Sequence, residues 1–214
     1  MVSLDRRDAV PGWRAVEFAL LFLVLPVVAA TLFPPFWVWP VLVCVTAVGL
    51  VLLAATPGFR WRSLIEDGVD WRSVGLVAGL TVVAALILVP TLVPDRAFGL
   101  PRRSLRLWAT VMLLYPLLSA LPQELLFRPL FFHRYGALFP SPRVAVAVNG
   151  FVFGLAHLMF WNWVALGMTT VGGFLFALGY RRHGFPTAVV MHAVAGCILF
   201  TSGLGAFFYH GAVR

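Results

Sequence analysis

The stretch "QELLFR" (Gln123–Arg128) places an acid and a base four residues apart inside a segment that is otherwise almost wholly apolar. Six of the eight acidic residues lie near polar joints and Glu17 lies at the edge of an apolar segment, so only Glu124 lies well inside one. On a helix, this spacing puts Glu124 and Arg128 on one face, close enough for a salt bridge. The arginine would keep the carboxylate ionised, as a water-activating general base requires. A salt bridge that only pins one helix to another is the alternative.

Two histidines lie in other apolar segments, His157 in "FGLAH" and His192 in "MHAVAG". Each alone is as typical of a hydrogen-bonded packing residue as of a catalytic one. Together with Glu124 they place ionisable groups on three separate helices, where such groups are costly and usually functional or paired. A carboxylate base with imidazoles that donate to a developing oxyanion makes a workable hydrolytic site. One Glu and two His could also bind zinc, but no HExxH-type ligand pair lies on one helix, so we expect no cofactor.

The other histidines lie near the ends of apolar segments or of the chain. His133 and His183 are next to arginines, which favours a solvated or headgroup role, and His210 lies near the C-terminus and carries no prediction. Asn149 precedes the histidine of "FGLAH" by eight residues and lies on roughly the same helix face, where it could orient a site group. Asn162 ends the same segment and is predicted to be a helix-end residue.

The elements that must position these groups are seven long apolar segments separated by short polar joints. Hydrophobic residues make up 61% of the chain and charged residues 11%, far outside the range of a soluble globular domain. Each segment approaches the roughly 20 residues that a helix needs to cross the hydrocarbon core. The sequence therefore predicts an all-α, polytopic transmembrane helical bundle with about seven to eight spans. The segments cover residues 16–33, 36–56, 74–94, 107–132, 144–162, 163–180 and 185–208.

Polar residues inside these segments gather after residue 105, and the first three spans carry almost none. We therefore expect one integrated membrane domain, in which residues 1–104 form supporting helices and residues 105–214 form the catalytic core. Glycines recur in "GMTTVGGFLFALGY" (Gly167–Tyr180), and small residues let membrane helices approach one another closely.

All sixteen basic residues are arginines, and fifteen of them lie near the ends of the predicted spans. Ten against five on the two sides predicts a cytoplasmic N-terminus. We expect the bilayer as a partner and no nucleic acid, and an Arg-only, Ala-rich chain suggests a bacterial inner membrane. At 1.5 Å per residue, Glu124 lies about 12 Å and His192 about 10 Å from the cytoplasmic ends of their segments, so we expect the site to open towards that half. The ten are Arg6, Arg7, Arg14, Arg60, Arg62, Arg72, Arg134, Arg143, Arg181 and Arg182, and the five are Arg96, Arg102, Arg103, Arg106 and Arg214.

The ordered set of motifs resembles that of the CPBP intramembrane proteases, a family that includes the type II CAAX prenyl endopeptidases and the bacterial Abi proteins. Its pattern is Glu-Glu-x-x-x-Arg, Phe-x-x-x-His and His-x-x-x-Asn/Asp on successive membrane helices, and the resemblance covers about residues 105–205. It implies a metal-independent protease in which a Glu activates water, while the His residues and the Asn/Asp position the water and stabilise the oxyanion. The matching positions are Glu124 for the second Glu, Arg128 for the Arg, Phe153 and His157 for the second motif, and His192 for the third.

Two positions depart from the family pattern. Gln123 replaces the first Glu, which is usually assigned as the base, and Gly196 replaces the Asn/Asp. An amide cannot take up a proton, so we predict that Glu124 is the base, that Gln123 holds the water or the scissile carbonyl, and that His157 and His192 stabilise the oxyanion. The predicted function is an intramembrane endopeptidase for membrane-associated proteins or peptides. The alternative is an inactive relative that binds a membrane partner in the same cavity. Because CAAX prenylation is not expected in a bacterium, peptide or sorting-tail processing is the favoured task.

Overall fold

The computed structural model describes residues 11–208, and every regular element in that range is a helix. Six of these helices are long and apolar enough to cross a membrane, and the 17-residue helix α3 is a shorter apolar one. At 1.5 Å per residue α3 is roughly 26 Å long, close to the thickness of the hydrocarbon core. The structure confirms an all-α polytopic bundle with six to seven membrane-length helices among the described residues. In chain order these are Gly12–Leu32, α3 (Val38–Ala54), α4 (Trp71–Leu92), Leu105–Leu138, Pro142–Phe160, α9 (Trp163–His183) and α10 (Phe185–Ser202).

Three of these helices are composite. Prolines explain the wider turns of the longest one, because a proline has no N–H to donate and its ring clashes with the carbonyl one turn earlier. Its two π-helical segments begin at or contain Pro116 and Pro129. The components are α1 (Gly12–Ala19), η1 (Leu20–Val24) and α2 (Leu25–Leu32) in the first helix; α6 (Leu105–Tyr115), η5 (Pro116–Ala120), α7 (Leu121–Leu125), η6 (Leu126–Tyr135) and η7 (Gly136–Leu138) in the long helix; and α8 (Pro142–Leu155) with η8 (Leu158–Phe160). Short helices η2 (Pro35–Trp37), η3 (Trp61–Leu64), η4 (Pro94–Arg96), α5 (Gly99–Arg103) and η9 (Leu204–Phe208) make or flank the joints.

Side chains of the polar joints cap four of the spans. In each case the oxygen of the capping residue accepts a hydrogen bond from the backbone N–H three residues later, which satisfies one of the free donors at a helix start. The caps are Asp70 for α4, Ser104 for α6, Ser141 for α8 and Asn162 for α9. The prediction that Asn162 is a helix-end residue is therefore confirmed. Hydrogen bonds from Ser73 lower the pKa of the Asp70 carboxyl, so this cap stays ionised at neutral pH.

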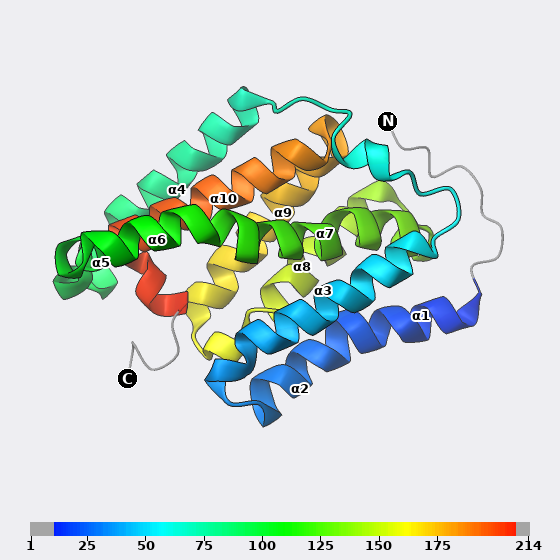
Figure 1. The fold of residues 1–214 in the computed structure, drawn as a ribbon, viewed down its shortest axis with the longest axis horizontal. Helices are drawn as coiled ribbons and strands as arrows, with labels where there is room; N and C mark the ends of the chain where they lie inside the picture. The colour runs from blue at the N-terminus through cyan, green and yellow to red at the C-terminus, as the bar shows by residue number, and fades with distance from the viewer. Residues whose placement is uncertain (1–10, 209–214) are drawn as a thin grey trace.

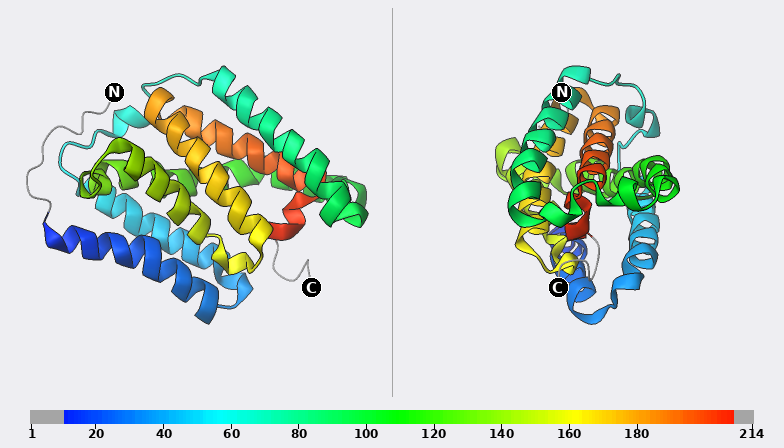
Figure 2. Two further views of the ribbon diagram at one scale, coloured as in Figure 1. Left: turned by 180° about the vertical axis from the view of Figure 1, so that it is seen from behind. Right: turned by 90° about the vertical axis from the view of Figure 1, so that its left-hand side faces the viewer.

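The helices form a layer with the long helix lying across it. α10 packs against α4 on one side and α9 on the other, and α8 packs along α9 (Figure 2). The long helix runs across one face of this layer, in front of α10 and α9 in Figure 1, and α3 and the first helix lie beside the long helix. A Cβ added at Gly173 would lie 2.7 Å from the Cβ of Phe153, and one at Gly154 would lie 2.0 Å from Thr170 Oγ1. Glycine therefore permits the close α8–α9 packing, as predicted for Gly173, whereas a Cβ added at Gly167 would meet no other described element within 4 Å.

The two ends of the bundle carry different numbers of arginines. We call the N-terminal end the one where α1, α4, α8 and α10 begin, and the opposite end the one where α3, the long helix and α9 begin. Arg6, Arg7, Arg214 and His210 lie outside the described residues. The described arginines of the N-terminal end are Arg14, Arg60, Arg62, Arg72, Arg134, Arg143, Arg181 and Arg182, and those of the opposite end are Arg96, Arg102, Arg103 and Arg106. The arginine excess at the N-terminal end agrees with the predicted one, eight against four among the described residues. The cytoplasmic location of the N-terminus stays a prediction.

A polar cluster that the sequence did not predict ties the first helix to the long helix. Arg134 donates from Nη2 to Glu17 at 2.9 Å and from Nε to the other oxygen of that carboxylate, and the Tyr135 hydroxyl also donates to Glu17. Arg134 further donates to the Leu52 carbonyl and the Thr56 hydroxyl, both at 3.3 Å. Its side chain is 6% exposed, so this arginine does not face the headgroups as the sequence suggested. The cluster joins the first helix, α3 and the long helix at the N-terminal end.

Candidate active site

Glu124 and Arg128 form a fully buried ion pair in the middle of the long helix. The Glu124 carboxylate accepts hydrogen bonds from Arg128 Nε at 2.7 Å and Nη2 at 3.2 Å, and neither side chain has exposed surface. Arg128 also donates to the Asn149 side-chain oxygen, and Asn149 donates from Nδ2 to the Phe127 carbonyl at 2.6 Å. The predicted pairing at a spacing of four is confirmed, and Asn149 holds a site group as expected. A buried charge of this kind is tolerated only when its partners satisfy it.

His192 on α10 contacts the same carboxylate. Its Nδ1 lies 2.9 Å from Glu124 Oε1, and its ring stacks on Phe176 with centroids 4.9 Å apart and planes 16° apart. A carboxylate can only accept, so Nδ1 carries a proton, and in the neutral form of the ring Nε2 keeps a lone pair. Only 5% of the residue is exposed. Glu124 therefore fixes both the tautomer and the orientation of this imidazole.

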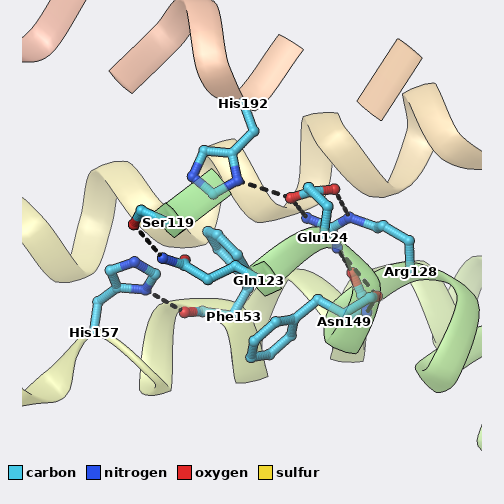
Figure 3. Close-up of polar contacts among 9 residues, drawn as sticks. Ser119, Gln123, Glu124, Arg128, Asn149, Phe153, His157 and His192 are labelled. Carbon is cyan, nitrogen blue, oxygen red and sulfur yellow. Dashed lines mark hydrogen bonds and ion pairs between the residues drawn. The ribbon is translucent and has the colours of Figure 1, made fainter. Parts of the chain in front are cut away.

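His157 is held in a similar way from another helix. It lies two residues after the end of α8, and its Nδ1 lies 2.8 Å from the Phe153 carbonyl oxygen. A carbonyl is also only an acceptor, so Nδ1 carries the proton here too and Nε2 is an acceptor. The Phe153 ring contacts both imidazoles, with centroids 4.9 Å from His157 and 5.4 Å from His192. In both histidines Nδ1 faces the supporting oxygen, so Nε2 points away from it (Figure 3). The two rings belong to the same group of side chains.

Gln123 lies on a different face of the long helix from its neighbour Glu124. Its Nε2 donates to the Ser119 hydroxyl at 3.0 Å, and its Oε1 is buried with no hydrogen-bond partner among the described residues. Figure 3 shows this amide on the side of the site where His157 lies, apart from the Glu124–Arg128 pair. A buried amide oxygen without a partner is costly, so a bound group that donates to it would be stabilised there.

A cavity of about 1180 Å³ lies between the long helix and the layer of α4, α9 and α10. Its walls are mostly apolar, and side chains near its inner part include Ser119, Gln123, His157 and His192. Glu124 and Arg128 are not among the residues that line it. A membrane-embedded apolar cavity with a few convergent polar groups is typical of a binding site for an amphipathic or apolar chain.

The cavity extends towards the opposite end of the bundle, where Arg96 and Arg103 also line it. The expectation that the site opens towards the half that contains the N-terminus is therefore wrong. The expectation failed because the Glu17 cluster and the packed η6 segment fill the N-terminal end, where Phe131 and Tyr135 have no exposed surface.

The remaining predicted residues lie away from this cavity. The His133 ring packs edge-on against Phe59 at 5.3 Å, and His183 Nε2 lies 3.6 Å from the Asp70 carboxylate with its side chain 38% exposed. Within residues 11–208 no three His, Cys, Asp or Glu side chains are grouped so as to hold a metal ion. The expectation that no cofactor is needed stays a prediction.

Sequence reasoning missed Ser119 and Tyr115, which line the cavity from the helix that carries Gln123. Residues 115, 119 and 123 are spaced by four, a pattern that places polar groups on one helix face. That spacing was the available signal. It was obscured because all three residues are uncharged.

Fold and site together define the chain as a polytopic membrane protein with a carboxylate–imidazole site beside an apolar intramembrane cavity. Residues 105–198 match the family model described as type II CAAX prenyl endopeptidase Rce1-like. The match supports assigning the chain to the CPBP and CAAX protease family, as its motifs predicted. No curated protein and no solved structure matches the chain. The chain is therefore an integral membrane protein whose residues 105–198 are similar to a membrane protease family, and the division into supporting and catalytic parts stays a prediction.

Proposed function

We propose that this protein is an intramembrane endopeptidase that hydrolyses a peptide bond in membrane-associated proteins or peptides. The proposal depends on the position of His192. The buried Glu124–Arg128 pair holds this imidazole through Glu124, and the same residue lines the apolar cavity. A carboxylate behind an imidazole orients the ring and stabilises its protonated form, which is the arrangement a general base needs.

The base in this proposal is the imidazole of His192, with Glu124 behind it. This revises the sequence-based assignment of Glu124 itself. Both oxygens of Glu124 accept hydrogen bonds, from Arg128 and His192, and its side chain has no exposed surface. A water molecule in the cavity therefore meets the imidazole before it can meet the carboxylate. Glu124 acts through His192 by holding its proton on Nδ1 and by countering the charge that forms on the ring.

We propose that the two Nε2 atoms share a single water molecule. A water can donate one hydrogen to Nε2 of His157 and the other to Nε2 of His192, which leaves an oxygen lone pair free to attack. In the proposed step the water oxygen bonds to the scissile carbonyl carbon, the carbonyl π pair moves to its oxygen, and a water proton passes to His192. The imidazolium then gives this proton to the amide nitrogen, the C–N bond breaks, and a new carboxyl terminus and a new amine are released.

The Gln123 amide is a second polar group for the substrate. Its N–H can turn from Ser119 to donate to the oxyanion, and its unpartnered oxygen can accept from a substrate N–H. The cavity volume of about 1180 Å³ has room for several residues of an apolar chain or for a lipid-modified terminus. Peptides and sorting tails remain the favoured substrates, and the family description adds a prenylated terminus as a candidate.

The second candidate function is that of a catalytically inactive protein that binds a membrane partner in the same cavity. Gln123 and Gly196 favour it, because the residues that the family uses at these positions are absent. A binder would keep its cellular effect when the imidazoles are removed, whereas an enzyme would lose it.

The test compares the protein termini in membranes of cells that express the wild type, His157→Ala, His192→Ala or His183→Ala. The proposal expects a shortened terminus with the wild type and with the exposed control His183→Ala, and its absence with the other two. Detergent-purified variants are checked for folding by thermal unfolding. A terminus that persists in His192→Ala would contradict the proposal. Prenylated and unprenylated forms of a CAAX-ending peptide, incubated with the purified protein in liposomes, separate the two substrate classes.

A further inference from the structure

Gly196 on α10 leaves a space that a ring from another helix fills. A Cβ added at Gly196 would lie 2.1 to 2.3 Å from three atoms of Tyr115, the Cε1, Cζ and hydroxyl oxygen. Non-bonded carbon and oxygen atoms do not approach this closely, so a side chain at position 196 would displace the tyrosine ring from its present place. The phenol therefore rests directly on the α10 backbone, at the position where the family pattern has an Asn or Asp.

Neighbouring side chains hold the Tyr115 ring in this place. It packs edge-to-face against His192 with centroids 6.0 Å apart and against Phe200 at 5.3 Å. These two residues lie one turn before and one turn after Gly196 on α10, so the Tyr115 ring packs over Gly196 between their side chains. Such contacts fix the ring plane and with it the direction of the hydroxyl group.

Tyr115 is a cavity-lining residue whose hydroxyl group has no hydrogen-bond partner among the described residues. Tyr115 lines the same cavity as His192, and within residues 11–208 its oxygen makes no hydrogen bond. A tyrosine hydroxyl near a buried site normally finds a partner. The same helix face continues with Ser119 and Gln123, so three polar groups of the long helix line the cavity that the two imidazoles also line.

We propose that the Tyr115 hydroxyl donates a hydrogen bond to the oxyanion and thereby takes over the task of the side chain that Gly196 lacks. The inference rests on the proposed peptidase function. When water attacks the scissile carbonyl, negative charge develops on the carbonyl oxygen, and a neutral phenol is a preorganised donor for it. Tyr115 gives up no proton in this step. The exchange of a short polar side chain on α10 for a tyrosine on the long helix moves the donor from one wall of the site to the other.

The first test is Tyr115→Phe, which removes one oxygen atom and leaves the packing of the ring unchanged. Removal of one oxyanion donor typically lowers kcat by about 10²-fold to 10³-fold, and we expect a loss in this range with KM nearly unchanged. The assay uses the peptide that carries the cleavage site found in membranes, with purified protein in liposomes. Tyr180→Phe is the matched control, because Tyr180 stacks on Phe132 and does not line the cavity.

A swap of the two positions tests the replacement itself. Tyr115→Ala opens the space above Gly196, and Tyr115→Ala combined with Gly196→Asn puts an amide donor into it. We expect the double variant to cleave at least tenfold faster than Tyr115→Ala. Equal rates for the wild type and Tyr115→Phe would overturn the inference and leave the peptidase proposal intact. A wild type that leaves every peptide uncut would overturn both.

Discussion

Replacement of Glu124 by glutamine isolates the cost of the buried charge. The substitution keeps the size of the side chain and removes its charge. The carboxylate accepts from Arg128 at 2.7 and 3.2 Å and from His192 at 2.9 Å, with no exposed surface on Glu124 or Arg128. An amide has one acceptor oxygen and one NH₂ group, so at least one of these donors would face another donor. Arg128 would then be a buried charge without a counter-ion.

The expected destabilisation follows from this geometry. Breaking a buried ion pair by removing one partner costs about 3–5 kcal/mol. At about 2–4 °C per kcal/mol for a chain of this length, the melting temperature should fall by roughly 6–20 °C. Replacing both partners with apolar residues of similar volume is often neutral or stabilising. We therefore expect Glu124→Leu combined with Arg128→Met to melt within a few degrees of the wild type and to be inactive.

The assay is thermal unfolding of the purified variants in one detergent, followed by tryptophan fluorescence or by dye binding to Cys197. The double variant separates the two roles of the pair, because it restores stability without the charge that orients His192. A Glu124→Gln variant that melts within about 2 °C of the wild type, well below the shift expected for a buried ion pair, would refute the reasoning.

Two further substitutions test the packing. Gly173→Leu should force α8 and α9 apart at Phe153 and cost about 1–3 kcal/mol or more. Gly167→Leu should leave the melting temperature nearly unchanged, because a Cβ at this position would meet no other described element within 4 Å. Equal effects of the two substitutions would contradict the close packing. Glu17→Gln should lower the free energy of unfolding by about 1.5–3 kcal/mol, because Arg134 loses a charge-assisted partner. The variant should also make the N-terminal helix more sensitive to added protease. Unchanged digestion would show that the Glu17 cluster does not anchor that helix.

Much of the fold was predictable because hydropathy and spacing are local properties. Each of the seven apolar segments corresponds to an apolar helix, and the Glu124–Arg128 pair and the Asn162 cap follow from short spacings. The His192 contact with Glu124 joins residues 68 positions apart, and it was predicted because ionisable groups buried in separate membrane helices usually meet one another, a prediction that the resemblance of the motifs reinforced.

What the sequence did not predict depends on how helices rotate and pack. Gln123 and Glu124 are adjacent, and only the packing of α10 decides that the amide lines the cavity and the carboxylate faces Arg128. The π-helical turns of the long helix also change which faces align, and periodicity does not reveal them. The contact between Glu17 and Arg134 joins residues 117 positions apart and has no local signal.

The rate of peptide cleavage by His192→Ala tests the central claim most directly. Purified wild type and variant are placed in identical liposomes with the substrate identified in membranes, and the first-order rate constants are compared. Loss of a general base typically lowers the rate by about 10²-fold to 10⁴-fold, so we predict a fall of that size in a variant that keeps its melting temperature. Cleavage by the variant at the wild-type rate would contradict the account.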